Sequence, residues 1–274
     1  MSLYRPNALD RALAFLGEGP AAVVAGGTDV FPALGLRPAP LRVLDLSAVA
    51  GLRGITQVNG DWRIGAGTTW TDVVRADLPP LFDALKQAAR QVGSIQIQNT
   101  GTVAGNICNA SPAADGVPVL IAMEAEVELA SHRGTRRMPL SDFITGPRKT
   151  DLREGEIVTA LYLPHRDGAR SAFGKLGSRT YLVISIVSDA VILWTEGRIV
   201  TGARVAVGAA SPVPMRLPEA EAALVGRALS DLPGAVLADH LAALTPIDDV
   251  RATAAYRREA ALVMIRRALE GLGQ

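Results

Sequence analysis

The spacing of apolar residues changes from helical to strand-like near the start of the chain. Residues 7–20 carry apolar side chains at helical spacing, with Asn7 as the predicted cap and Gly17 as the predicted end. Residues 21–27 follow as a short apolar run that ends in glycines. This run predicts a buried strand that leads into a turn.

The middle of the chain mixes hairpin, helix and strand patterns. Two alternating runs flank Asn59-Gly60 and predict a β-hairpin, because this dipeptide adopts the tight turn that twisted strands require. Residues 78–94 predict a helix of about four turns that follows prolines and ends at Gly93. Further along, the pattern predicts a buried helix at 117–125 and strands at 126–131 and 156–164.

From Ala172 onward, long runs of β-type residues predict a second unit of sheet and helices. The expected strands span 186–194 and 198–211, and the expected helices span 218–229, 235–244 and 251–272. Proline, glycine and charge cluster at residues 164–170, which favours a domain boundary there. The chain is therefore predicted to be an α+β protein with domains at 1–166 and 170–274.

Composition and charge favour work on a small molecule. The chain has 274 residues, 49% of them hydrophobic and 20% charged, which is typical of a globular protein with a sizeable core. The net charge is +1, and residues of both charges are scattered along the chain, so the sequence shows no basic cluster that would bind nucleic acid or an anionic membrane. No stretch resembles a signal peptide or a membrane span, so the sequence predicts a cytoplasmic protein.

Cysteine and histidine are too sparse for a metal centre of this chain's own. One cysteine excludes an internal disulfide and is too little sulfur for structural zinc or an iron–sulfur cluster. The three histidines, His132, His165 and His240, lack the spacing of metal ligands. Any metal that the protein needs is predicted to lie in another chain.

Two glycine-rich segments carry the strongest functional signal: "VVAGGTDV" at 23–30 and "NTGTVAGNICNASPAAD" at 99–115. Glycines let main-chain N–H groups approach phosphate oxygens, and the neighbouring Thr, Asn and Asp residues offer short donors and acceptors. Neither segment matches the dinucleotide fingerprint or the P-loop, which disfavours a Rossmann fold. Two tight turns without a ligand are the alternative interpretation.

Four ordered motifs resemble the FAD-binding subunit of the xanthine dehydrogenase family of molybdenum hydroxylases. They are "AGGTDV" at 25–30, the segment at 99–115, "GPRKTDLREGEIV" at 146–158 and "FGKLGSR" at 173–179. The resemblance implies a two-lobed FAD-binding domain of the vanillyl-alcohol oxidase type, with FAD held non-covalently between the lobes. It also implies a C-terminal domain like that of the family's flavoproteins.

By this resemblance, two sets of residues contact the phosphate, ribityl and adenine parts of FAD. The first is the loop Ala25, Gly26, Gly27, Thr28 and Asp29, and the second comprises Thr102, Gly105, Asn106, Asn109 and Asp115. Asp115 could instead cap the helix that follows it.

The resemblance places Val158 and Lys175 beside the isoalloxazine ring, where a lysine can stabilise negative charge on reduced flavin. A core valine and a surface lysine are the alternatives.

The chain departs from the family pattern at Gln98, where arginine is usual, and at Ala104, where glycine is usual. Ala104 is acceptable if its φ angle is negative, whereas Gln98 is expected to alter a contact at the partner surface or the adenine end. Cys108 is interpreted as a small packing residue beneath the loop, because no histidine lies nearby to activate it.

The resemblance implies that this chain is the last electron carrier of a complex. A large subunit would hold the molybdenum cofactor, a small subunit would hold 2Fe-2S clusters, and FAD would pass electrons to NAD or another acceptor. A stand-alone flavin oxidoreductase and a non-catalytic nucleotide-binding assembly module are the alternatives. The sequence shows no paired acid and base for direct substrate oxidation.

Overall fold

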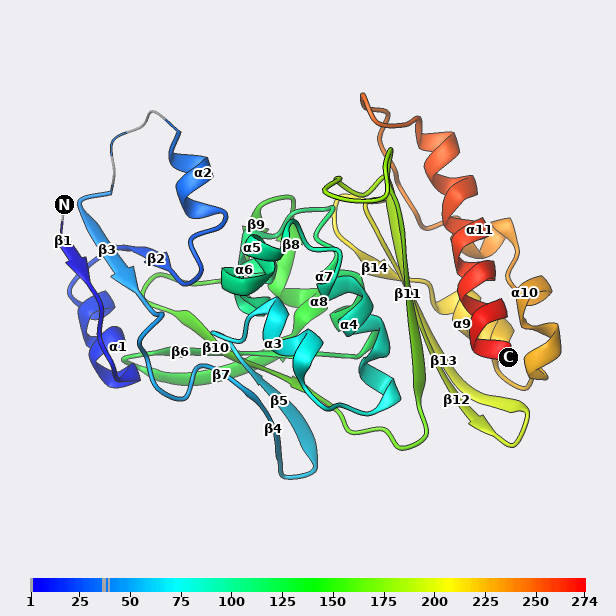
Figure 1. Cartoon of the computed structure of the whole chain (residues 1–274), viewed down its shortest axis with the longest axis horizontal. Coiled ribbons are helices and arrows are strands. Elements are labelled where there is room, and N and C mark those ends of the chain that lie inside the picture. The colour runs from blue at the N-terminus through cyan, green and yellow to red at the C-terminus, as the bar shows by residue number, and fades with distance from the viewer. Residues whose placement is uncertain (1, 36–37, 39) are drawn as a thin grey trace.

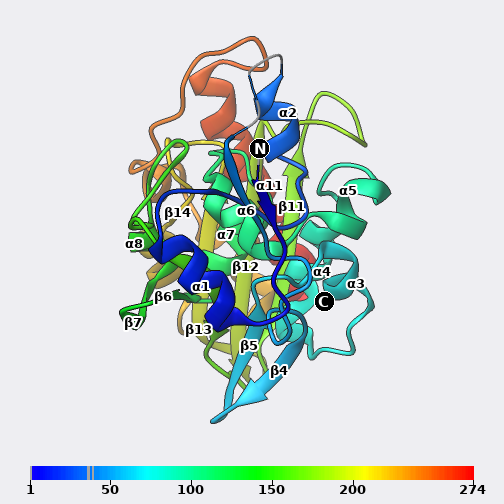
Figure 2. The ribbon, with the colours of Figure 1, turned by 90° about the vertical axis from the view of Figure 1, so that its left-hand side faces the viewer.

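The N-terminal part is a small parallel sheet with one helix against it. The structure, a computed structural model, describes residues 2–35, 38 and 40–274. The sheet has the order β1-β3-β2, and Figure 2 views it from the N-terminal side. Its elements are β1 (Ser2–Tyr4), α1 (Leu9–Gly17), β2 (Ala22–Val24) and β3 (Arg42–Asp45).

Helix α1 ends at Gly17 as predicted, but Asn7 does not cap it. The N-cap is Ala8, whose methyl side chain cannot accept a hydrogen bond, and the Asn7 carbonyl accepts the N–H of Ala50 at 3.0 Å.

A five-stranded antiparallel sheet follows, with the order β4-β5-β10-β6-β7. The predicted hairpin is confirmed, with Asn59 at φ 53° and Gly60 at φ 92°, both in the left-handed region that this turn needs. The strands at 126–131 and 156–164 are confirmed as well. The sheet comprises β4 (Ile55–Val58), β5 (Asp61–Gly65), β6 (Glu126–Ser131), β7 (Gly134–Pro139) and β10 (Ile157–Leu163).

Short helices follow strands β5 and β7 along the chain. They are α3 (Trp70–Arg75), α4 (Asp83–Ala89), α5 (Ile95–Thr100), α6 (Val103–Asn109), α7 (Gly116–Ala122) and α8 (Leu140–Phe143), followed by the hairpin β8 (Ile144–Gly146) and β9 (Lys149–Thr150). The helix predicted over 78–94 is shorter, with a 3₁₀ turn at Pro80–Phe82 before α4. It stops early because the Arg90 carbonyl accepts the Gln98 side-chain amide at 3.0 Å.

The C-terminal part is a four-stranded antiparallel sheet in the order β11-β12-β13-β14, covered by helices. Its elements are β11 (Arg170–Leu176), β12 (Val187–Glu196), β13 (Ile199–Gly208), β14 (Met215–Arg216), α9 (Pro218–Leu224), α10 (Leu232–Ala235) and α11 (Ala254–Gly273), with 3₁₀ turns at Leu229–Asp231 and Ala238–Leu241.

Two of the predicted C-terminal helices differ from the structure. The helix expected over 235–244 is wrong, because Val236 is extended and its carbonyl accepts two N–H bonds from Arg266, at 3.0 and 2.8 Å. Helix α9 stops at Leu224, before the predicted end, because Val225 is extended and Gly226 has φ 81°.

The four-stranded sheet is covered on both faces, which explains its apolar runs. Figure 1 shows it between α4 and α7 on one side and α11 on the other. Phe173, Ala190 and Ile192 join the core that α4 and α7 share with the five-stranded sheet. Val191 and Leu193 pack instead with the core that contains Ile265 and Leu269 of α11. The mixed helix and sheet class is therefore confirmed, and the predicted boundary falls between β10 and β11.

No helix in the described ranges has both the length and the apolar character needed to cross a bilayer.

Asp189 is a buried acid whose charge should destabilise the fold. Its side chain is 0% exposed, and neither carboxylate oxygen has a hydrogen-bond partner among the residues that the structure describes. Burial raises the pKa of Asp189 to about 7, far above its value in an unfolded chain. The folded state therefore holds this proton more tightly, so the contribution of Asp189 to stability is largest at low pH and falls as pH rises towards and through 7.

We expect Asp189→Asn to abolish this fall, because the neutral amide cannot ionise. The free energy of unfolding should rise relative to the parent by up to about 4 kcal/mol at pH 8.5, and by about half as much at pH 5.5. Urea denaturation at both pH values measures it, with the exposed Asp239→Asn as control. A variant that keeps the parent's pH dependence would show that Asp189 does not titrate in the fold.

Candidate functional site

The first glycine segment forms a tight loop between β2 and α2 (Val30–Leu34). Gly26 lies so close to the next segment that a Cβ atom there would be 1.9 Å from the Thr100 carbonyl oxygen. Gly27 has φ 71°, in the left-handed region that favours glycine. Both glycines are thus required by the path of the main chain, and the loop is held directly against Thr100 and Gly101.

The second segment is helical rather than an open loop, which corrects the sequence interpretation. Thr102 caps α6, and its hydroxyl accepts the N–H of Gly105 at 2.9 Å. The helix ends at Ala110, which is left-handed with φ 47°. Ala104 lies inside α6 and not among the residues of positive φ, so the methyl group is accommodated as expected.

Gln98 is buried and bonded to the Arg90 carbonyl. It therefore serves an internal contact, and the expectation of a role at a partner surface is wrong.

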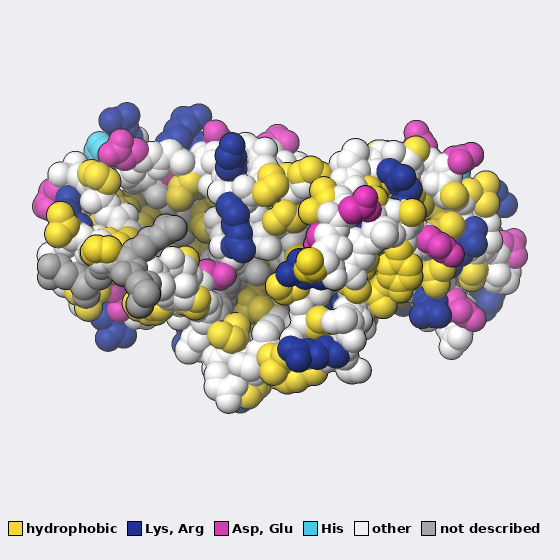
Figure 3. Space-filling view, turned by 90° about the horizontal axis from the view of Figure 1, so that it is seen from above, with side chains coloured by type: hydrophobic (Ala, Val, Ile, Leu, Met, Phe, Trp, Pro, Cys, Tyr) yellow, Lys and Arg dark blue, Asp and Glu magenta, His cyan; other side chains and the backbone are white. Residues whose placement is uncertain are grey.

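These segments meet around one large cavity of about 1030 Å³, at the upper end of the range for small-molecule sites. Figure 3 shows the face on which the surface is hollowed beside the N-terminal part. All twelve residues predicted from the sequence line the cavity: Ala25, Gly26, Gly27, Thr28, Asp29, Thr102, Gly105, Asn106, Asn109, Asp115, Val158 and Lys175.

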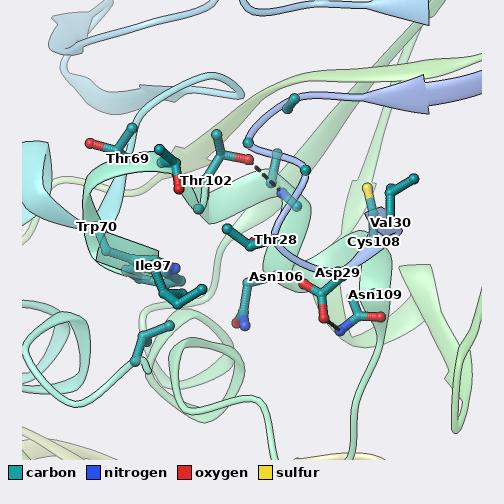
Figure 4. A pocket seen from close by; sticks show the side chains of 18 of the residues that line it. Thr28, Asp29, Val30, Thr69, Trp70, Ile97, Thr102, Asn106, Cys108 and Asn109 are labelled. Atoms are coloured by element: carbon teal, nitrogen blue, oxygen red, sulfur yellow. Dashed lines mark hydrogen bonds between the residues drawn. The ribbon is translucent and has the colours of Figure 1, made fainter. Parts of the chain in front are cut away.

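A chain of hydrogen bonds joins three segments at one side of the cavity. Asn109 Nδ2 donates to Asp29 Oδ1 at 2.6 Å, which links α6 to the first loop (Figure 4). Arg148 Nη1 donates to the Asn109 side-chain oxygen and to the Asn109 carbonyl, the latter at 3.3 Å. Asp29 and Asn109 are therefore positioned by contacts within the protein as well as facing the cavity.

Asn106 presents an unsatisfied acceptor. Its Oδ1 is buried without a hydrogen-bond partner in the described part of the chain, and its side chain projects among Thr28, Ile97 and Asn109 in Figure 4. A buried amide oxygen without a partner is costly, and this one lies against the start of α7, 3.2 Å from where a Cβ on Gly116 would stand.

Asp115 and Lys175 form a buried ion pair on the cavity wall, with 2.6 Å between Lys175 Nζ and Asp115 Oδ2. The Ser185 hydroxyl donates to Asp115 Oδ1 at 2.5 Å, and Lys175 also donates to the Gln91 carbonyl at 3.2 Å. Burial raises the pKa of Asp115, against the opposing effect of Lys175. Asp115 occupies the predicted N-cap position of α7 but makes no side-chain cap bond to it, and Lys175 is not a surface lysine, because its side chain is only 6% exposed within β11.

Val158 is 5% exposed and lies at a bulge in β10, so it is a core residue that also lines the cavity.

Cys108 differs from its expected packing role, since it is exposed and lines the cavity. No histidine is among the described residues that line the cavity, so the thiol has no histidine there to activate it.

Sequence reasoning missed several lining residues. Gly67, Thr69 and Trp70 follow the hairpin, and the composition of "GAGTT" at 65–69, like that of the two glycine segments, was the signal available. Leu182, Val183 and Ile184 precede β12 and reach the cavity only through the fold. The described residues contain no group of three or more His, Cys, Asp or Glu that could hold a metal ion.

Comparisons with known proteins agree with this geometry. The family model described as FAD binding domain in molybdopterin dehydrogenase matches residues 1–166, and that of the CO dehydrogenase flavoprotein C-terminal domain matches residues 172–272. The glyceraldehyde dehydrogenase medium chain of Sulfolobus acidocaldarius is 32% identical, covering 98% of this chain and 97% of the relative. A putative xanthine dehydrogenase FAD-binding subunit of Escherichia coli is 34% identical, covering 80% and 77%.

Among solved structures, reconstituted CO dehydrogenase from Oligotropha carboxidovorans superimposes with a TM-score of 0.91 at 29% identity, covering 98% of this chain and 96% of that one. The chain belongs to the family of FAD-binding domains of molybdopterin dehydrogenases, which are oxidoreductases. The resemblance inferred from the four motifs is confirmed, and so is FAD as the family's cofactor.

We expect Gly26→Ala and Gly105→Ala to weaken FAD binding to different extents. A Cβ on Gly26 meets main chain that cannot move away alone, whereas a Cβ on Gly105 meets only the Thr102 hydroxyl at 2.9 Å. Overpacking of about 1–3 kcal/mol predicts that Gly26→Ala weakens FAD binding roughly tenfold or more, with a smaller loss in Gly105→Ala. Fluorescence titration of the apoprotein measures this. Gly271→Ala, whose Cβ meets open space, is the control, and equal affinity in all three variants would contradict the loop's role.

Proposed function

We propose that this chain is the FAD-carrying electron-transfer subunit of a molybdenum hydroxylase complex. It would take electrons from iron–sulfur clusters of a partner subunit and pass them to NAD or another acceptor. The observation that carries the proposal is the convergence of both glycine segments on one cavity.

The residues present fit FAD. Thr28 and Thr102 supply hydroxyl groups, Asn106 and Asn109 supply amides, and the loop at 25–29 supplies main chain without bulky side chains. When bound, FAD would supply one-electron and hydride chemistry, because flavin exchanges electrons in either form. Val158 and Lys175 would lie beside its ring.

The binding would be non-covalent. None of the histidines is among the described residues that line the cavity, so Cys108 has no histidine there to activate its thiol.

We propose further that the FAD-binding domain, residues 1–166, has two lobes of the vanillyl-alcohol oxidase type. The β2–α2 loop belongs to the parallel sheet, while Val158 belongs to the five-stranded sheet, and both line the same cavity. FAD would lie between these two lobes, with residues 170–274 as the second domain.

A large molybdenum-cofactor subunit and a small 2Fe-2S subunit are the proposed partners. Relatives are described as medium chains, one of a glyceraldehyde dehydrogenase and others of carbon monoxide dehydrogenases. A family member of this kind would leave substrate choice to the large subunit.

Two measurements test the proposal: whether the purified chain contains FAD, and whether substrate reduces that FAD in the isolated chain or only in the full complex. We expect the purified chain to be yellow and to release unmodified FAD on denaturation, since no histidine is among the described lining residues to bond the flavin or to activate Cys108. Stopped-flow absorbance should show no bleaching by a purine or an aldehyde with the isolated chain, and rapid bleaching in the full complex with its substrate. Bleaching in the isolated chain would instead support a stand-alone oxidoreductase, and failure to bind FAD would favour a non-catalytic module.

The Asp115–Lys175 pair predicts two opposite shifts in the reduction potential of bound flavin. Asp115→Asn leaves the Lys175 cation unbalanced and should raise the potential, while Lys175→Met leaves a carboxylate and should lower it, each by on the order of tens of mV. The lowering should be smaller at low pH, because the buried Asp115 carboxyl then takes up a proton. Redox titration with reference dyes measures both, and the double variant is the matched control. Unchanged potentials in both single variants would remove the pair from the flavin's surroundings.

A further inference from the structure

We propose that Arg148 binds the diphosphate group of the dinucleotide, an inference that rests on the proposed function. Arg148 lies in the turn between β8 and β9 and lines the cavity. Its φ of 59° is unusual for a residue with a side chain. The turn is held in place because the Arg148 N–H donates to the Ala110 carbonyl at 2.8 Å, at the end of α6.

Part of the Arg148 guanidinium makes no hydrogen bond within the described residues. Within the described residues, only Nη1 donates a hydrogen bond, to the two oxygens of Asn109. The Nε and Nη2 groups make no such bond there, and no carboxylate lies within ion-pair distance. The undescribed residues Met1, Leu36, Arg37 and Ala39 include no acid that could supply one. The side chain is exposed, so its free N–H groups are accessible to a ligand.

The other described cations that line the cavity are already neutralised. Arg53 forms an ion pair with Asp72 at 2.7 Å, and Lys175 forms one with Asp115 at 2.6 Å. Arg148 is therefore the cation available to an anionic ligand among the described lining residues.

The Arg148 cation offsets a negative charge that faces the same cavity. Asp29 faces the same cavity, and a carboxylate repels phosphate oxygens. The hydrogen-bond chain from Asp29 through Asn109 to Arg148 sets a positive group next to that carboxylate. A guanidinium also matches phosphate geometry, because it can donate two parallel N–H bonds.

The experiment compares ligands with and without phosphate on the full-length apoprotein. In Arg148→Met, the affinity for FAD should fall about 10- to 100-fold, while that for riboflavin should change by less than about twofold. Arg148→Lys should fall between the parent and Arg148→Met, since it keeps the charge and loses the planar fork. The neighbouring exposed Lys149→Met, outside the cavity lining, is the control and should bind both ligands like the parent.

Added NaCl should weaken binding of FAD to the parent and leave riboflavin unaffected, because salt screens the phosphate contact. If Arg148→Met does not fold, the salt dependence of the parent tests the inference instead. Equal effects of NaCl on the binding of FAD and riboflavin would overturn it. So would unchanged FAD affinity in Arg148→Met, or an equal loss for FAD and riboflavin, which would mark a role confined to the turn. A parent chain that binds no FAD would overturn the proposed function itself.

Discussion

The cavity depends on the close approach of two stretches of main chain, at Gly26 and Thr100. Any side chain at position 26 would overlap the Thr100 carbonyl, so the β2–α2 loop packs against the next segment with nothing between them. Through this contact the parallel sheet is set against α5 and α6. The hydrogen bond between Asp29 and Asn109, at 2.6 Å, adds a second link further along the same loop. Two separated links fix the orientation of the loop as well as its position.

Short-range patterns predicted those parts of the fold that local chemistry determines. The Asn59-Gly60 hairpin was predictable because its turn needs two left-handed residues in sequence. The long helix α11 was predictable from its apolar spacing, and Thr253 caps it through the N–H of Tyr256 at 3.2 Å. The twelve site residues could be named because they fall within sequence motifs, and their common cavity bears out that they belong together, although their contacts with FAD stay a prediction.

One error was a local signal that was missed, and another arose where a distant residue decides the local conformation. The glycines and asparagines of 99–115 look like a loop, yet the Thr102 cap and the left-handed Ala110 enclose a helix between them. The helix expected over 235–244 failed because Arg266, far along the chain, takes the Val236 carbonyl. Arg148 belongs to a motif, but its free donors could not be seen from sequence, since they depend on which acids the fold brings near.

The Asp115–Lys175 ion pair has two effects: it sets the charge on the cavity wall, and it attaches the C-terminal sheet to the rest of the protein. Asp115 precedes α7, Lys175 lies in β11, and Ser185, which precedes β12, bonds the same carboxylate. Lys175 also reaches the Gln91 carbonyl beyond the end of α4. Both ions are buried, so neither can lose its partner without leaving an unpaired charge, which is strongly destabilising. The pair therefore holds the C-terminal sheet against α4 and α7 by the same contact that leaves this wall nearly neutral, and the net attraction for an anion is left to Arg148.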